Sequence, residues 1–187
     1  MGAGGARPGE FTDCPAVEAS PRSQPGLADE LGALLDRHLL WMASGWECGQ
    51  RADLHGRDLH AADLRYAFLV DADLHRADLH DADLTGSEFD GADLHRADLH
   101  GANLHDADLH CADLHRADLH GADLSGCSLD EADLHGADLH AADFTHADLR
   151  DADLRGADLR EARGLTRAQI ETANVDAMTR LPAGMSD

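Results

Sequence analysis

Hydrophobic and polar positions follow a five-residue period through most of this chain. Between residues 52 and 161 an apolar central residue recurs at every fifth position, from Leu54 to Leu159, which makes 22 repeats. A five-residue step rotates a helical side chain by about 140°, so these leucines would spread over every face of a helix. Five is also odd, so successive leucines of one strand would point to opposite faces of a sheet. The period therefore excludes a plain helix and a plain sheet.

Each repeat has the alternation of a very short strand followed by a turn. Ala and Leu are two residues apart with Asp between them, so Ala and Leu face one side and Asp faces the other. The next two residues must then turn the chain so that the following Ala-x-Leu also faces inward. If each turn is about 90°, four repeats close a square 20-residue coil, and successive coils stack at ~4.8 Å. The pattern predicts an all-β solenoid of about 5.5 coils. Its predicted core includes Leu54, Leu74, Leu94, Leu104, Leu114, Leu134 and Leu154.

Departures from the repeat support the 20-residue coil because they recur at multiples of 20. The segment "HRADLH" begins at residues 75, 95 and 115. The segment "TGSEFDGADLHRADLH" at 85–100 resembles "SGCSLDEADLHGADLH" at 125–140. Such a register stacks similar side chains on one another.

The flanks of the repeats predict capping segments. Residues 1–26 are rich in Gly, Pro, Ala and Ser and are predicted to be a disordered tail. Residues 27–51 form a predicted N-terminal capping helix and linker, with leucines at helical spacing over 27–43. The β-helix occupies 52–161, and 162–187 form a C-terminal capping helix and tail, with Thr166 as N-cap. Caps are needed because terminal coils expose unpaired strand edges.

Charge narrows the class of partner. The chain carries a formal charge of −22, which disfavours direct binding to nucleic acid or to an anionic membrane and favours a basic partner. No apolar run is long enough to span a bilayer, and the N-terminus lacks the apolar segment of a signal peptide. The four cysteines show no metal-ligand spacing, so they are interpreted as reduced thiols of a cytoplasmic protein. Cys127 is a predicted core residue, and the outward-facing Cys111 is the more reactive thiol.

The repeats resemble the pentapeptide-repeat family, whose motif is A-(D/N)-L-x-x. The match runs from Ala52 to Glu161, and the flanks "HLLWMASGWECGQRADLHGRDL" and "GLTRAQIETANVDAMTRLP" are also similar to flanks in that family. The resemblance implies a right-handed quadrilateral β-helix. It also implies a candidate role, because the best understood members are DNA mimics that bind DNA gyrase or topoisomerase IV and inhibit or protect it.

The predicted surface is strongly acidic. The repeat block holds 27 of the 37 acidic residues but only 8 of the 15 basic ones. Over a predicted length of ~26 Å, this excess of acidic over basic side chains is similar to the ~15 negative charges of an equal length of duplex DNA. The alternative explanation is that the aspartates only keep a repetitive β-rod soluble. The predicted interaction surface is the fourth side of the coil, which carries Asp71, Asp90, Asp130, Glu131 and Asp151.

Histidine columns and one apolar cluster allow other interpretations of the surface. Stacked imidazoles flanked by carboxylates are candidates for binding Zn, Ni or Cu, although a regular ladder lacks convergent ligands. They also predict a surface that loses negative charge on acidification. The apolar cluster Tyr66, Phe68 and Val70 is predicted either to be covered by the 27–43 helix or its linker, or to form a partner or homodimer contact. The candidate metal ligands are His75, His95, His115, His80, His100 and His120.

No catalytic constellation is present in the sequence. There is no nucleophile with a positioned base and no glycine-rich phosphate loop, and the tube interior is filled by Leu and Ala. The sequence therefore predicts a non-enzymatic protein without a cofactor. The predictions that remain open are an acidic interaction module, a structural or adaptor rod, and a metal- or pH-responsive surface.

Overall fold

The computed structural model describes residues 27–185, so the predicted disordered tail over 1–26 lies outside the described part of the chain. The chain divides into two units, one ending at Gln50 and the other beginning at Arg51. In the first unit, helix α1 spans Leu27–Ala43, the residues over which the leucine spacing predicts a helix. His38 of this helix is fully buried and stacks on Trp41, with ring centroids 5.5 Å apart. Within residues 27–185, neither helix has the length and apolar character needed to cross a bilayer.

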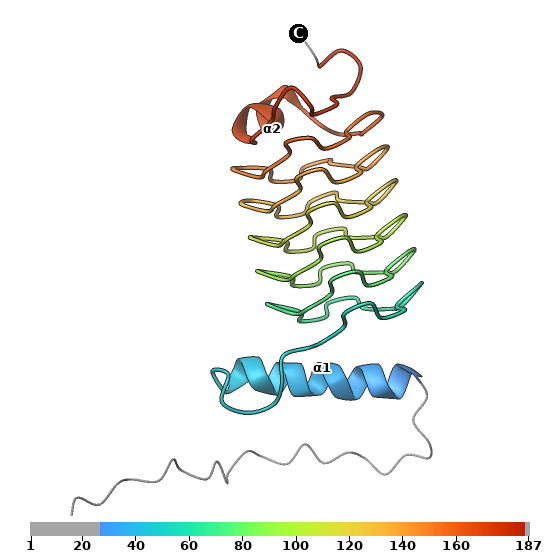
Figure 1. Ribbon diagram of the computed structural model, residues 1–187, viewed down its shortest axis with the longest axis vertical. Helices are drawn as coiled ribbons and strands as arrows, with labels where there is room; N and C mark the ends of the chain where they lie inside the picture. The colour runs from blue at the N-terminus through green and yellow to red at the C-terminus, as the bar shows by residue number, and fades with distance from the viewer. Residues whose placement is uncertain (1–26, 186–187) are drawn as a thin grey trace, which may run out of the picture. The chain divides into compact units, whose positions relative to one another are not determined.

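The second unit is a stack of coils (Figure 1). Its β-structure consists of isolated parallel bridges that join each repeat to the equivalent repeat of the next coil, beginning with Asp53–Asp73 and Asp58–Asp78. The same spacing continues to Asp143–Arg163. This pairing confirms the 20-residue coil that the sequence predicts, with four repeats in each coil.

A repeat with a central Asp can satisfy every one of its backbone N–H groups, as residues 72–76 illustrate. The Asp73, Leu74 and Arg76 N–H groups donate to carbonyls of the neighbouring coils at 2.7 to 3.0 Å, and the Ala72 N–H donates to the Leu69 carbonyl across the turn. The remaining N–H, of His75, donates to the Asp73 carboxylate at 3.1 Å. Buried backbone groups must be paired for a fold to be stable, so a central Asp has a structural function in the repeats that carry it.

The core is a column of leucine and alanine side chains. The predicted core residues Leu54, Leu74 and Leu104, for example, are at most 1% exposed. Larger and polar residues also fit inward positions: Phe89 and Phe144 are fully buried, and the Ser87 hydroxyl donates to the Leu84 carbonyl. The Cys127 thiol donates to the Leu104 carbonyl at 2.9 Å, as a small core residue with a weak donor can do.

The C-terminal segment continues the hydrogen bonding of the last coil. Helix α2 spans Arg167–Thr172 and begins at the predicted N-cap Thr166, which forms a capping box with Gln169. The Gln169 side-chain amide also donates to the Phe144 and Ala147 carbonyls at 3.0 and 2.8 Å. Two further bridges, Asp153–Asn174 and Asp158–Arg180, extend the ladders beyond the repeats. This segment therefore pairs with strand edges that the last repeats would otherwise leave open.

The cysteines differ from the sequence prediction. Cys48 is disulfide-bonded, whereas Cys111 and Cys127 are free. The prediction that all four are reduced is therefore wrong for Cys48. Disulfide pairing depends on distances in the folded chain, and the spacing of cysteines in a sequence does not reveal it.

Candidate interaction surface

Four corner columns run along the stack, each formed by the two turn residues that end the repeats of one side. The fifth residue of each repeat has a positive φ, for example 58° at Arg96 and 65° at Gly101. A negative and then a positive φ at the two central residues is the pattern of a type II turn. The turn fixes where the fourth and fifth side chains point, so equivalent residues of successive coils lie above one another.

The first corner carries a regular histidine ladder. Its members are His55, His75, His95, His115 and His135, with adjacent ring centroids 5.0 Å apart and ring planes within 12° of parallel. Burial lowers the pKa of His95; the Asp113 carboxylate opposes this shift, and the charges of His115 and His75 reinforce it. Protonating one ring of the ladder thus disfavours protonating its neighbours.

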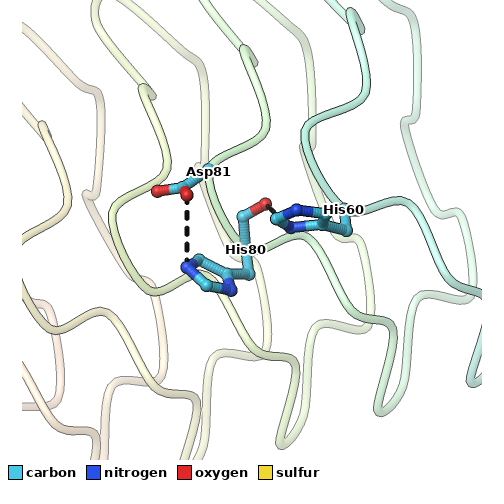
Figure 2. A group of neighbouring side chains, drawn as sticks. All are labelled: His60, His80 and Asp81. Atoms are coloured by element: carbon cyan, nitrogen blue, oxygen red, sulfur yellow. Dashed lines mark hydrogen bonds and ion pairs between the residues drawn. The ribbon is translucent and has the colours of Figure 1, made fainter.

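The second corner carries the other histidine ladder, which begins less regularly. His60 and His80 are tilted by 54°, and His80 and His100 by 74°, whereas the later rings stack within 7° of parallel. Figure 2 shows the irregular part: His60 Nδ1 lies 3.0 Å from the His80 carbonyl oxygen, and His80 Nε2 lies 3.3 Å from Asp81 Oδ2. The rotated rings bring His60, His80 and Asp81 together, with ligand atoms within 4.8 Å of one another.

The regular histidine ladders do not converge on a metal position. Parallel rings 5.0 Å apart hold equivalent nitrogens at about the same separation, whereas two nitrogens on one tetrahedral Zn²⁺ lie roughly 3.3 Å apart. Among the described residues, three or more metal-ligand side chains meet at His60, His80 and Asp81 and at Asp90, His110 and Cys111. Of the six histidines that the sequence nominates, only His80 belongs to either group, because the ladder pattern gives ring positions but not ring rotations.

The fourth corner, called here the acidic corner, holds Asp71, Asp90, Asp130, Glu131 and Asp151, and between them His110 and Cys111. Asp71, Glu131 and Asp151 are exposed, and Asp90 and Asp130 are half-buried. His110 Nδ1 lies 3.1 Å from both the carbonyl oxygen and the Oδ2 atom of Asp130. The Ser128 hydroxyl donates to the other carboxylate oxygen of Asp130 at 2.7 Å. The predicted interaction residues thus lie along one edge of the stack, with His110 held among them.

Cys111 is less reactive than its exposure suggests. Its Sγ lies 3.4 Å from His110 Nε2 and 3.8 Å from Glu131 Oε2. Desolvation raises the pKa of the Cys111 thiol, and the negative charges of Glu131 and Asp90 raise it further. Because the thiolate is the nucleophile, a raised pKa lowers the reactive fraction at neutral pH. The sequence indicates only that Cys111 is exposed, and its reactivity is predicted from that exposure. The neighbouring carboxylates lower this reactivity.

The central aspartates have a function that the sequence interpretation missed. Their Oδ1 atoms accept the backbone N–H two residues later in nearly every repeat, for example Asp93 from His95 at 3.0 Å and Asp98 from His100 at 3.0 Å. Asn103 makes the same bond to His105 at 3.1 Å. An Asp that bonds the backbone two residues on is a known turn signal, and it was readable in the A-(D/N)-L-x-x pattern. These aspartates therefore have two functions: they contribute charge to the surface, and they stabilise the turns.

The apolar cluster predicted at Tyr66, Phe68 and Val70 is partly exposed. Tyr66 is 70% exposed and Phe68 43%, and Val70 is half-buried. A Cβ atom at Gly86 would lie 2.7 Å from the Tyr66 ring, so the ring covers that glycine of the next coil. A homodimer or partner contact at this cluster stays a prediction.

Comparison with known families agrees with this architecture. The family model described as "Pentapeptide repeats (8 copies)" matches residues 52–91, 87–126 and 127–163, which is more than half of the chain. The chain is a pentapeptide-repeat protein. Proteins of this family adopt a right-handed quadrilateral β-helix, and they are generally non-enzymatic structural or interaction modules.

Several solved pentapeptide-repeat structures are similar to this pentapeptide-repeat protein, and no curated protein sequence matches it. HetL from the cyanobacterium Nostoc sp. strain PCC 7120, which is involved in heterocyst differentiation regulation, is 27% identical over 70% of this chain and 73% of its own, with a TM-score of 0.30. A pentapeptide repeat protein of the Arabidopsis thaliana thylakoid lumen is also 27% identical, over 70% and 83%, with a TM-score of 0.38. Trypsin-treated QnrB1, a plasmid-mediated fluoroquinolone resistance protein, is 20% identical over 67% and 71%, with a TM-score of 0.41. The roles of these proteins differ, so similarity alone does not assign one to this chain.

Proposed function

We propose that this pentapeptide-repeat protein is a non-enzymatic interaction protein that presents a duplex-like array of negative charge to a basic, DNA-binding surface of a partner. The observation that supports this proposal is the regular stacking of carboxylates on a coil of fixed height. Stacked histidine rings 5.0 Å apart measure that height. The acidic corner adds charges beyond those that the backbone needs.

The charge density is close to that of DNA. One coil of four repeats adds 5.0 Å to the stack, and the repeats together hold 27 acidic against 8 basic side chains. This amounts to roughly one net negative charge per ~1.5 Å, compared with one per ~1.7 Å in duplex DNA. A partner that binds duplex DNA through Lys and Arg therefore meets a similar linear charge on this protein.

The family resemblance of the sequence makes DNA gyrase or topoisomerase IV the first partner to test, with inhibition or protection as the effect. This partner is proposed to meet the protein in the cytoplasm. A structural or adaptor rod without a topoisomerase partner is the outcome if that test fails. The proposal does not include a direct contact with nucleic acid or with a membrane.

The first test is a binding and supercoiling assay with purified gyrase, with and without a quinolone. Binding is expected to weaken steeply as salt is raised, because charge complementarity contributes most of the attraction. Unchanged supercoiling, unchanged quinolone-stabilised cleavage and no capture of gyrase at micromolar protein would remove the topoisomerase partner from the proposal.

A matched pair of variants tests whether position matters as well as charge. Replacing Asp71, Asp90, Asp130 and Asp151 with Asn is expected to weaken binding more than replacing Asp73, Asp93, Asp113 and Asp133 on the first side. Both sets remove four charges, and Asn keeps the turn bond that the second set makes. Equal loss of binding from both sets would show nonspecific attraction.

The pH dependence of binding is an independent test within the same assay. Protonated histidine ladders cancel part of the negative charge, so binding is expected to weaken as the pH falls. Burial lowers the pKa of His95, so this ring gains its charge at a lower pH than an ordinary histidine does. Binding that is constant between pH 7.5 and pH 5.5 would contradict a duplex-like mode of recognition.

A further inference from the structure

The acidic corner contains four potential metal ligands of three chemical kinds. They are the carboxylates of Asp90 and Glu131, the imidazole of His110 and the thiol of Cys111. These residues come from three successive coils, because Asp90, His110 and Asp130 occupy the same place in neighbouring coils. We infer that Asp90, His110, Cys111 and Glu131 form a binding site for one borderline-soft divalent metal ion of the Zn²⁺ class.

The distances from the Cys111 sulfur to two of the other ligand atoms fit a tetrahedral ion. Zn–S bonds of about 2.3 Å and Zn–N or Zn–O bonds of about 2.0–2.2 Å place sulfur roughly 3.6 Å from the other ligand atoms of a tetrahedron. Cys111 Sγ lies 3.4 Å from His110 Nε2 and 3.8 Å from Glu131 Oε2. The ligand atoms of Asp90, His110 and Cys111 all lie within 4.8 Å of one another. Glu131 is near Cys111 but is not a member of that group, so side-chain rotations of both the half-buried Asp90 and the exposed Glu131 are needed to complete the tetrahedron.

His110 is held in the orientation that a metal ligand needs. Its Nδ1 faces both the carbonyl oxygen and the Oδ2 atom of Asp130 at 3.1 Å, so the proton lies on Nδ1 and the lone pair of Nε2 faces Cys111. Metal-binding histidines almost always donate their other ring N–H to a carboxylate or a carbonyl in this way. Asp130 is fixed in turn by the Ser128 hydroxyl at 2.7 Å. This support is independent of the ligand distances.

The ligand types decide which ions fit. A thiolate and an imidazole select Zn²⁺ and related ions, whereas Mg²⁺ and Ca²⁺ prefer sites made of oxygen ligands. The other group, His60, His80 and Asp81 (Figure 2), has no thiol. On binding, the Cys111 S–H bond breaks, a sulfur–metal bond forms and the proton passes to the buffer. The ion would also neutralise part of the charge of the acidic corner.

The test is a titration of the full-length, untagged protein with Co²⁺, a spectroscopic substitute for Zn²⁺. The protein is handled under argon without thiol reductant, so that the Cys48 disulfide stays intact. One Co²⁺ per chain is expected to produce a thiolate-to-cobalt charge-transfer band and the intense visible bands of a tetrahedral ion. Zn²⁺ is expected to displace Co²⁺, and Mg²⁺ in large excess is not.

Three variants separate this site from general attraction to an acidic surface. Cys111→Ser is expected to abolish the charge-transfer band and to weaken binding at least tenfold. Asp130→Asn is expected to weaken binding about 10–100-fold through the orientation of His110, without loss of the band at saturation. Cys127→Ser changes the other free thiol of residues 27–185, which is buried, and is expected to bind Co²⁺ as the natural protein does.

The outcomes are distinct. Equal binding by the Cys111→Ser and Cys127→Ser variants, a spectrum without thiolate bands, or displacement of Co²⁺ by Mg²⁺ would each overturn the site. A thermal-melting check on each variant separates loss of the site from loss of the fold. None of these measurements involves gyrase, so the metal site and the proposed function can fail separately.

Discussion

At the scale of single residues, the backbone conformation of the fifth residue of each repeat has an energetic cost that cannot be recognised in the sequence. Every repeat ends on a residue with positive φ, and many of these are not glycine, including Asp71, Arg96 and Ala141. Residues with a Cβ atom lose roughly 1–2 kcal/mol in this conformation. The fold tolerates the cost because each turn is fixed by bonds to the coils on either side.

This cost predicts opposite effects for two substitutions in one corner column. Ala141 has φ 61° and Gly121, one coil earlier, has φ 69° with open space where a Cβ would lie. Ala141→Gly is expected to raise the free energy of unfolding, and Gly121→Ala to lower it, each by about 1 kcal/mol. Chemical denaturation of both variants measures the changes. Two shifts of the same sign would show that the turn conformation is not their cause.

The arginines near the C-terminal end of the repeats give the fold a defined acid sensitivity. Side-chain hydrogen bonds from Arg160 lower the pKa of the Asp158 carboxyl to about 2, against the opposing effect of its burial. An unfolded aspartate titrates near ~3.9, so this pair stabilises the fold above about pH 4. That contribution is lost as the pH falls from about 4 to about 2, because the unfolded chain takes up the proton first.

Melting temperatures measured from pH 6 to pH 2 test this pair. Arg160→Gln is expected to melt below the natural protein at pH 6 and to lose less on acidification between pH 4 and pH 2. Arg116→Gln is the control with the same charge change, since Arg116 makes no ion pair among residues 27–185. Identical pH profiles for the two variants would assign the effect to net charge.

At the scale of elements, the coil depends on one inward leucine per repeat. Leu104 is fully buried between two coils whose backbones are fixed by hydrogen bonds. Leu104→Ala is therefore expected to cost about 2–5 kcal/mol of unfolding free energy, because the tube cannot collapse around the cavity. Asp98→Asn is the outward control and should be nearly neutral, since Asn103 shows that an amide oxygen accepts the same turn bond. A larger loss for Asp98→Asn would contradict this assignment of inward and outward positions.

Much of the coil could be predicted because its rules are local. The Ala-Asp-Leu alternation gives the inward positions, and the recurrence of "HRADLH" at 75, 95 and 115 gives the four sides. The N-cap at Thr166 follows from side-chain chemistry alone. Each of these features depends on residues close in sequence or on an exact repeat.

The remaining features depend on distances that no local rule supplies. The approach of His110 to Cys111 and Glu131 requires the rotamers of side chains from neighbouring coils. The tilt of His60 against His80 likewise breaks a ladder that is regular in sequence. The disulfide of Cys48 depends on the folded path of the chain. Sequence therefore located the acidic side of the coil but not the arrangement of ligands within it.

At the scale of the whole molecule, the ends of the stack decide whether it stays a single particle. At the C-terminal end, residues up to Arg180 pair with the last repeats. The sequence predicts that residues 27–51 protect the other end. Deletion of residues 27–49 is expected to cause association through exposed strand edges and leucines, which size-exclusion chromatography with light scattering measures. A truncated protein that stays monomeric and melts at an unchanged temperature would show that α1 is not a cap.

The pairing of each repeat with its equivalent in the next coil also sets how the repeats would respond to a mechanical load. The bonds between coils lie along the stacking direction, so tension applied to the two ends of the repeats would open the stack one coil at a time. A released 20-residue coil extends to roughly 65–70 Å, compared with ~5 Å in the stack. The repeats would therefore lengthen in nearly equal steps of about 60–65 Å, each step corresponding to the unfolding of one coil.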